Sequence, residues 1–335
     1  MRKLFFVIVA GLLFGVAHAQ EESGKQFNRY GMALEKKGVG WTVRNEARMG
    51  ERFGFDPDTI PSWREPWRYV PDRIQPADLE KCMVRSFDYK QYPGYTCHMD
   101  VYLPAGQGDG PFPFMLFIHG GGWTTGHEKT PNMVLPASWF ASNGIAVMSV
   151  SYTLSGQGTF ADTCADLNDA LAFIRRHALE WGVDAARFGF YGFSAGGHLS
   201  SYMGLTTPGA KLFIASAGPA DMVAHGQAWL ADRKDLVHYF DFASGDMENL
   251  RKASPLFIIP QPGSRIPAGM IIQGLMDPLV DSQQSLNFAA ELNAKGAAVV
   301  ELRAVPYGPH GVVNPRFFRY EEFMFDMLDF AKKHL

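Results

Sequence analysis

The stretch RFGFYGFSAGGHLSSYMGL, residues 187–205, decides the fold. It opens with an apolar segment typical of a buried strand and continues after Ser194 with a segment typical of a helix. Between the two, GFSAG (192–196) has small residues on both sides of the serine, as a sharp strand-to-helix turn requires. Such a turn exposes the Ser194 hydroxyl at the helix N-terminus, where the helix dipole favours developing negative charge. A glycine-rich helix start with a capping serine is the alternative, but the flanking strand and helix favour a nucleophile.

Strands and helices are predicted to alternate along most of the chain around this stretch. Such alternation predicts an α/β fold in which helices cover both faces of a mostly parallel central sheet. The strand-like segments are KCMVRSFDY (81–89), TCHMDVYLP (96–104), FPFMLFIHG (112–120), GIAVMSVSY (144–152), RFGFYG (187–192), AGMIIQG (268–274) and AAVVELRAV (297–305). The expected helices span 162–181, 195–205 and 282–295, with a last one from about Arg316.

The glycine-rich sequence HGGGW (119–123) follows the strand-like segment 112–120. Glycines allow backbone N–H groups to approach a ligand oxygen closely, so Gly121 and Gly122, with Ala195 after the serine, are candidate oxyanion donors. A flexible loop or a phosphate-binding nest is the alternative. Neither G-K-[ST] nor G-x-G-x-x-G occurs at this strand, which argues against a phosphate site. Trp123 is expected to line the substrate pocket.

A nucleophilic serine needs a base, and ten histidines compete for that role. His310 lies in YGPHG (307–311), a loop between a strand and the last helix, from which an imidazole can reach the serine. His119 belongs to the glycine-rich loop. His198 lies one helical turn after Ser194, where it is expected to pack in the core or to support the loop.

The orienting acid is expected to be Asp277, which follows the strand-like segment 268–274 in GLMDPLV (274–280). Asp281 is the rival, but its place just before a helix is typical of an N-cap. The 33 residues from Asp277 to His310 accommodate one helix, one strand and two loops, which return the chain to the same sheet edge. The order Ser, Asp, His is the one expected for this type of fold.

Taken together, HGGGW (119–123), GFSAGGHL (192–199), GLMDPLV (274–280) and the loop histidine resemble the α/β-hydrolase superfamily, over roughly residues 81–335. The resemblance is to the esterase and lipase group related to hormone-sensitive lipase, with acetylxylan- and feruloyl-esterase-like carboxylesterases as the nearest branch. It implies that Ser194 is the nucleophile, His310 the base and Asp277 its orienting acid. It also implies that Gly121, Gly122 and Ala195 line the oxyanion hole, with no cofactor and no metal.

Two positions depart from the pattern of lipase-like relatives. Phe193 precedes the serine where those relatives often have aspartate, and Asp281 stands where they often have proline. Neither change touches the three residues of the triad. Both favour the carbohydrate-esterase side of the resemblance over the lipase branch.

Composition and the N-terminus limit the class of protein further. The chain has 335 residues, 47% of them hydrophobic, and a formal net charge of −3, which excludes a disordered chain and gives no sign of a nucleic-acid partner. Arg2 and Lys3 precede an apolar run that ends at Ala17-His18-Ala19, the pattern of a signal peptide over residues 1–19. We therefore expect an exported protein, periplasmic or secreted, without a membrane anchor after cleavage.

The mature chain is expected to comprise an N-terminal extension (20–80) and a catalytic domain (81–335), within which 223–266 is a possible lid or insertion. The extension carries Trp41, Trp63, Trp67 and Tyr69, which either stack on sugar rings or pack the extension onto the domain.

Export permits disulfides, so the pairing of the three cysteines matters. A hairpin centred on Pro93-Gly94 sets Cys97 opposite Lys90 and Cys82 opposite Ala105, which keeps the two cysteines apart. Cys164 is expected at the start of a helix. We therefore expect buried thiols rather than a disulfide.

Three hypotheses for function follow. The first is a serine carboxylesterase that takes a small-molecule or oligosaccharide ester. The second is an amide hydrolase with the same triad, and matched ester and anilide substrates would separate the two. The third is a non-catalytic binding protein on a hydrolase scaffold, which the presence of every catalytic element disfavours. Acyl preference and oligomeric state stay open.

Overall fold

A computed structural model describes the backbone of residues 33–37 and 40–44, and residues 74, 79–106, 108, 110–229, 233–241, 247–306, 308–313 and 320–335 with nearly all of their side chains. The chain divides into two units, Met1–Arg68 and Tyr69–Leu335. In the first unit, β1 (Ala33–Lys37) pairs antiparallel with β2 (Gly40–Arg44). The predicted signal peptide (1–19) and the side chains of Trp41, Trp63, Trp67 and Tyr69 lie outside the described residues. The predicted domain boundary near residue 80 stays a prediction.

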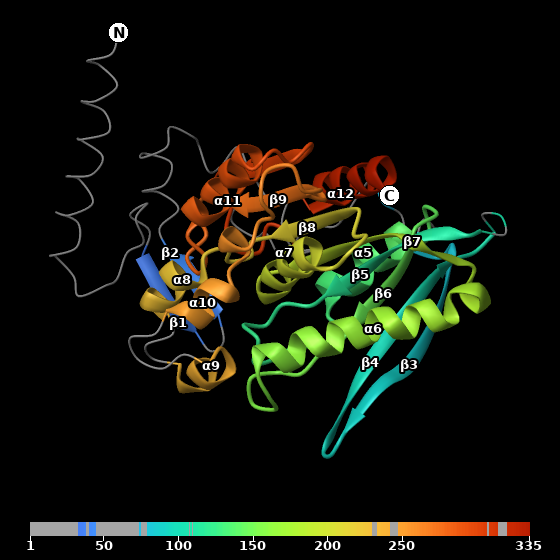
Figure 1. The fold of residues 1–335 in the computed structure, drawn as a ribbon, viewed down its shortest axis with the longest axis horizontal. Coiled ribbons are helices and arrows are strands. Elements are labelled where there is room, and N and C mark those ends of the chain that lie inside the picture. Colours follow the sequence, from blue (N-terminus) through green and yellow to red (C-terminus); the bar gives the residue numbers. More distant parts are fainter. Residues whose placement is uncertain are drawn as a thin grey trace, which may run out of the picture. The chain divides into compact units, whose positions relative to one another are not determined.

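The second unit is built on an eight-stranded sheet with the order β10-β9-β8-β7-β5-β6-β4-β3 (Figure 1). The pairs from β10 to β6 are parallel, whereas β4 pairs antiparallel with both β6 and β3. The strands are β3 (Cys82–Tyr92), β4 (Tyr95–Pro104), β5 (Phe112–Ile118), β6 (Ala146–Val150), β7 (Val183–Phe193), β8 (Leu212–Ser216), β9 (Ala268–Gly274) and β10 (Val300–Val305). The mostly parallel sheet predicted from the sequence is confirmed.

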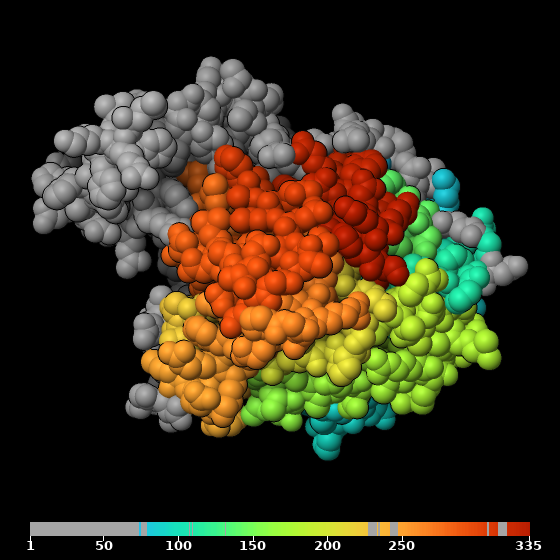
Figure 2. Space-filling model, turned by 45° about the horizontal axis from the view of Figure 1, so that its top comes forward, coloured from blue at the N-terminus to red at the C-terminus, as the bar shows by residue number. Residues whose placement is uncertain are grey.

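Helices cover both faces of this sheet. One face carries α6 (Phe160–Trp181), α7 (Ala195–Thr206) and α11 (Ser282–Ala294). The other carries α5 (Pro131–Ala141) and α12 (Tyr320–His334), which pack together through the edge-to-face rings of Trp139 and Phe325. In the space-filling view, α12 (red) borders α5 (green) (Figure 2). In this unit, the sequence does not single out α5, β8 or the short helices after β8.

The central strands are buried on both faces, which explains why their sequences are continuous runs of apolar residues. In β5, Phe114, Leu116 and Ile118 belong to the core under α6 and α7, whereas Met115 and Phe117 belong to the core under α5 and α12. All five side chains are fully buried. Because successive side chains of a strand point to opposite faces, a strand covered on both sides carries no polar alternation.

The antiparallel hairpin β3–β4 has the turn predicted at Pro93-Gly94, and Cys97 lies opposite Lys90 as expected. The prediction that Cys82 faces Ala105 is wrong, because the register shifts between Asp88 and Lys90 and sets Cys82 opposite Pro104. An irregularity of this kind adds one residue to one strand, and the turn gives no sign of it.

All three thiols are free, as expected, although only Cys97 is fully buried. Cys164 lies in the first turns of α6, the helix predicted to contain it. Burial raises the pKa of the thiol groups of both Cys97 and Cys164 to about 12, so neither is activated as a thiolate.

The segment 223–266, predicted as a possible lid, contains short helices between β8 and β9. They are α8 (Met222–Trp229), α9 (Lys234–Tyr239), α10 (Glu248–Lys252) and the 3₁₀ helix η3 (Pro255–Phe257), and residues 230–232 and 242–246 lie outside the described part. Tyr239 and Phe240 are buried in the core. A role as a lid stays a prediction. Within the described part of the chain, no helix has both the length and the apolar character needed to cross a membrane.

Candidate active site

Ser194 lies on a tight turn between the central strand β7 and helix α7. Its backbone φ of 58° and ψ of −120° lie in a region that non-glycine residues rarely adopt. The turn is fixed on both sides, because the Ser194 N–H donates to Ser216 O at 2.8 Å and its carbonyl accepts from the His198 N–H at 3.0 Å. The strained conformation therefore holds the hydroxyl away from the backbone at the end of the sheet.

The glycines on either side of Ser194 are required by close backbone packing. A Cβ on Gly192 would collide with the carbonyl of Gly196, and one on Gly196 would collide with the carbonyls of Ile118 and His119. The turn therefore packs directly against the end of β5, where the glycine-rich loop begins. This close packing explains why the GFSAG pattern has small residues on both sides of the serine.

The structure brings Ser194, His310 and Asp277 together in one hydrogen-bonded row. His310 Nε2 lies 2.9 Å from Ser194 Oγ, and His310 Nδ1 lies 2.7 Å from Asp277 Oδ2. The Asp277 side chain is fully buried, whereas that of His310 is 15% exposed. The His310 ring also packs on Phe193, with ring centroids 5.0 Å apart, so the residue that departs from the lipase pattern contacts the histidine directly.

Asp277 is held by groups that sequence reasoning did not find. Its Oδ1 accepts the backbone N–H groups of Leu279 and Val280 at 2.8 and 3.0 Å. Its Oδ2 accepts from Gln273 Nε2 at 3.0 Å, and Gln273 in turn accepts from Ser285 Oγ at 2.9 Å. A polar residue at the buried carboxyl end of an apolar strand was the available signal for Gln273.

The rival carboxylate, Asp281, does not join this row. It is the N-cap of α11, where its side chain accepts the Gln283 N–H at 2.8 Å. The sequence reading of Asp281 as a capping residue is confirmed.

The predicted oxyanion donors lie on the two segments that meet at Ser194. A Cβ on Gly120 would lie 3.1 Å from Ser194 Cβ, so the glycine-rich loop passes close to the serine. Gly121 and Gly122 have φ of 122° and 61°, and Ala195 is the first residue of α7. Among the described residues, no acceptor takes the N–H of Gly121, Gly122 or Ala195. That these three groups act as oxyanion donors stays a prediction.

Trp123, predicted to line the pocket, is only 1% exposed. Its ring packs edge-on against His198, His225 and Phe240, with centroids 5.4, 6.4 and 5.2 Å away. Its indole N–H lies 3.3 Å from His198 Nδ1, while His198 Nε2 lies 2.7 Å from Ala253 O. His198 therefore supports the loop from the core, as expected, whereas a direct contact between Trp123 and substrate stays a prediction.

Three histidines near the site are buried and uncharged. Burial lowers the pKa of His119, His198 and His225 to about 4 each. In His225, on α8, the neighbouring His310 lowers the pKa further. His225 was missed in the sequence because nothing in its spacing separates it from a core histidine.

Chemically, the row can move a proton from a serine hydroxyl to an imidazole whose far nitrogen faces a buried carboxylate. Among the described residues, no group of three or more His, Cys, Asp or Glu side chains is arranged to hold a metal ion. The row itself places a hydroxyl and an imidazole within hydrogen-bond distance of each other, at 2.9 Å.

Fold and site together define an α/β-hydrolase. The chain belongs to the BD-FAE family, a family of α/β-hydrolase esterases whose model matches residues 99–292. The family resemblance recognised in the sequence motifs is confirmed by this match.

Curated relatives include two proteins of Mycobacterium tuberculosis. The probable carboxylic ester hydrolase LipM is 28% identical over 66% of this chain and 54% of its own length. The esterase LipC is 25% identical over 70% of this chain and 58% of its own length. The chain thus spans about half the length of the curated relatives it matches.

Solved structures with the same fold include a truncated carbohydrate esterase from gut microbiota, with a TM-score of 0.61 and 22% identity over 76% of this chain and 98% of that one. Esterase 2 of Thermogutta terrifontis in its apo form has a TM-score of 0.62 and 21% identity, and covers 79% of this chain and 97% of its own. At this level of identity the likeness shows the fold alone.

Proposed function

We propose that the protein is an exported serine carboxylesterase that hydrolyses small or carbohydrate-linked carboxylic esters. One observation carries the proposal: His310 lies within hydrogen-bond distance of both Ser194 Oγ (2.9 Å) and the buried Asp277 carboxylate (2.7 Å). Such a row is what nucleophilic catalysis by a serine requires. Membership of the BD-FAE family and the names of the relatives, carboxylic ester hydrolase and esterase, support the same reaction.

In the first half of the reaction, Ser194 attacks the ester carbonyl. A neutral His310 with its proton on Nδ1 donates to Asp277 and leaves Nε2 to accept the serine proton. As the Oγ–carbon bond forms, that proton moves to Nε2 and the carbonyl electrons move to oxygen. Asp277 then faces an imidazolium, whose charge it stabilises in the water-poor interior.

The tetrahedral oxygen is expected to accept the N–H groups of Gly121, Gly122 and Ala195. Collapse of the intermediate breaks the carbon–oxygen bond to the alcohol, which leaves with the proton from His310 Nε2. Water then attacks the acyl-enzyme with His310 again as base, and the acid product leaves Ser194 free.

The substrate class and the export are supported by separate observations. Phe193 contacts the His310 ring where lipase-like relatives often have aspartate, which favours a branch other than the lipases. A structural relative is named a carbohydrate esterase. The basic start, apolar run and A-x-A site of residues 1–19 support export.

The experiment is hydrolysis of p-nitrophenyl acetate, butyrate and octanoate by the chain from Gln20, followed by acetylated and feruloylated sugars. We expect turnover of the short esters that is lost in Ser194→Ala. Asp281→Asn is the matched control, because it changes a neighbouring carboxylate that caps a helix outside the row. Wild-type protein as inactive as Ser194→Ala on every ester would contradict the proposal. A matched p-nitroanilide tests amide hydrolysis in the same assay.

A further inference from the structure

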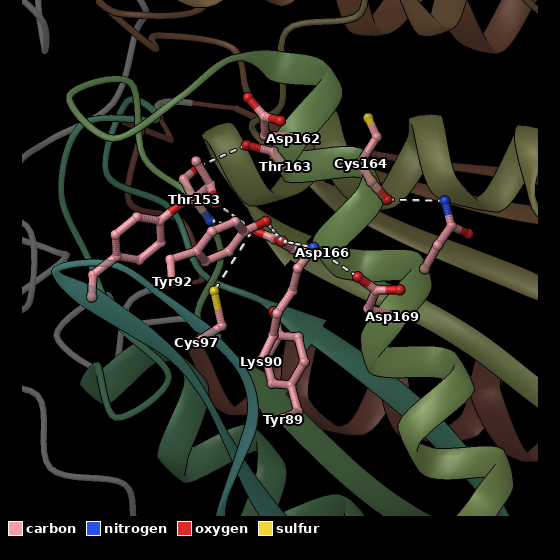
Figure 3. Close-up of polar contacts among 12 residues, drawn as sticks. Tyr89, Lys90, Tyr92, Cys97, Thr153, Asp162, Thr163, Cys164, Asp166 and Asp169 are labelled. Atoms are coloured by element: carbon pink, nitrogen blue, oxygen red, sulfur yellow. Dashed lines mark hydrogen bonds and ion pairs between the residues drawn. The ribbon is translucent and has the colours of Figure 1, made fainter.

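A buried aspartate lies at the centre of a polar cluster formed by β3, β4, α6 and the segment after β6. Asp166 belongs to α6, and its side chain is fully buried. Figure 3 shows side chains from β3, β4 and the segment after β6 pointing toward it, among them Lys90, Tyr92 and Thr153. The loss of water around a buried carboxylate has to be offset by cations or hydrogen-bond donors. The contacts of Asp166 therefore show which groups hold it.

Both oxygens of Asp166 accept strong hydrogen bonds. Oδ1 accepts from Lys90 Nζ at 2.8 Å and from the Tyr92 hydroxyl at 2.6 Å. Oδ2 accepts both the backbone N–H and the hydroxyl of Thr153, at 2.9 and 2.5 Å. Burial alone would raise the pKa of Asp166, but the hydrogen bonds from Lys90, Thr153 and Tyr92 outweigh it and lower the pKa. Asp166 is therefore a paired anion.

Thr153 is the residue that this anion fixes. Besides its two bonds to Asp166, its carbonyl accepts from Thr163 Oγ1 at 2.6 Å, and its hydroxyl lies 2.8 Å from the Tyr95 hydroxyl. Every polar atom of Thr153 is thus engaged. These hydrogen bonds fix the position of the backbone after β6 at Thr153.

The same segment holds the glycine-rich loop at both of its ends. One residue before Thr153, the Tyr152 hydroxyl donates to His119 O at 2.9 Å, and the two rings stack with centroids 4.3 Å apart. Two residues after Thr153, the Ser155 N–H donates to Trp123 O at 2.8 Å. Between these two anchored carbonyls lie the glycines whose N–H groups are the candidate oxyanion donors.

We propose that Asp166 is a positioning residue that sets the oxyanion loop for catalysis, by fixing Thr153 and through it the contacts of Tyr152 and Ser155 with that loop. The inference rests on the proposed function of Ser194. Removing one partner of a buried ion pair is destabilising by itself, so a loss of stability would not identify this role. A displacement of catalytic donors by about 1 Å, in contrast, can cost about 100-fold in rate. The readouts that separate this role from a merely structural one are therefore kinetic.

The test compares Asp166→Asn with Asp169→Asn. Asp169 also pairs with Lys90, at 2.7 Å, but its side chain is 53% exposed and no described contact joins it to Thr153. We expect Asp166→Asn to lower kcat by about 10- to 100-fold with KM changed less than about 2-fold, because the donors act on the transition state and not on the bound ester. Asp169→Asn is expected to stay within about 2-fold of wild type in both.

A second measurement does not depend on ester turnover. An alkyl fluorophosphonate reacts with Ser194: the Oγ–P bond forms, the P–F bond breaks, fluoride leaves and the serine proton passes to His310. The phosphoryl oxygen needs the same oxyanion donors. We expect the second-order labelling rate, read by intact mass, to fall about 10-fold or more in Asp166→Asn and to be unchanged in Asp169→Asn.

Tyr152→Phe serves if Asp166→Asn does not fold. It removes only the hydroxyl that donates to His119 O and keeps the stacked ring, so we expect a lower kcat and labelling rate at unchanged KM. Folded variants with a lower Tm but wild-type kcat and labelling rate would overturn the inference. Wild-type protein that is labelled at Ser194 but hydrolyses no ester would instead overturn the proposed function, and the labelling comparison would still decide the role of Asp166. Wild-type protein that is not labelled would overturn both.

Discussion

Replacing Asp277 with asparagine changes one atom at the buried end of the hydrogen-bonded row. Asp277 Oδ1 accepts the backbone N–H groups of Leu279 and Val280, which donate to no other described backbone carbonyl. The oxygen of the new amide is therefore expected to stay there, and its NH₂ group to point at His310 Nδ1, 2.7 Å away. Two N–H groups cannot donate to each other, so His310 has to accept at Nδ1 and carry its proton on Nε2.

This tautomer sets an N–H, not a lone pair, 2.9 Å from Ser194 Oγ, so the histidine cannot take the serine proton. The imidazolium that forms in the transition state also loses its anionic partner. In serine triads the same change costs about 10⁴ in kcat, or about 5 kcal/mol of barrier. Because ground-state binding of the ester does not use this carboxylate, KM is expected to change little.

The assay is steady-state hydrolysis of p-nitrophenyl acetate by Asp277→Asn, with Asp281→Asn as control. Asp281 caps α11 through Gln283 and has no described bond to His310. We expect the control to keep wild-type kcat and close to wild-type stability, because asparagine caps a helix about as well as aspartate. The reasoning is refuted if Asp277→Asn retains more than about a tenth of wild-type kcat, or if Asp281→Asn is the more damaging change.

Three further outcomes are expected. Gly196→Ala would press a methyl group against the carbonyls of Ile118 and His119, so we expect it to lose about 1–3 kcal/mol in urea unfolding and to lower kcat; wild-type values would contradict the packing. Because burial lowers the pKa of His119, His198 and His225 to about 4, they stay neutral in the folded protein while the unfolded chain protonates near pH 6.5. Stability should therefore fall as the pH drops from about 6.5 to 4, by up to about 4 kcal/mol per pH unit, and a flat urea-unfolding profile across that window would argue against it. Finally, alkylation of the unfolded chain without reductant, read by mass spectrometry, should modify all three cysteines, and a mass short of that by two alkyl groups would indicate a disulfide.

The sequence predicted the elements whose hydrophobic pattern is regular. The strand AGMIIQG (268–274) was predicted at its observed bounds, and the helix predicted over 162–181 begins two residues earlier, at Phe160. The helix α5 was missed because Pro136 lies inside it and its apolar residues show little periodicity. The strand β8 was missed because five buried residues are too short a signal.

In the candidate site, sequence motifs identified the residues whose chemistry requires particular neighbours in the chain. Ser194 needs small neighbours, and Asp277 and His310 follow strands, so each carries a signal in its own surroundings. Gln273, Asp166 and His225 carry weaker signals, because a polar residue in an apolar segment does not reveal its partner. The register shift in the β3–β4 hairpin is of the same kind, since nothing in the turn at Pro93-Gly94 indicates it.

The sequence alone thus determined the fold class, the turn at Ser194 and the identity of the candidate triad, because these depend on periodicity and on short-range steric requirements. Only the tertiary structure decided which groups hold Asp277 in place, how Asp166 is paired, and how the segment after β6 holds the glycine-rich loop. These contacts and the hydrogen bond between His310 and Ser194 join residues up to 116 positions apart. They form where strand ends converge at one edge of the sheet, and the order of strands there is set by the packing of the whole domain.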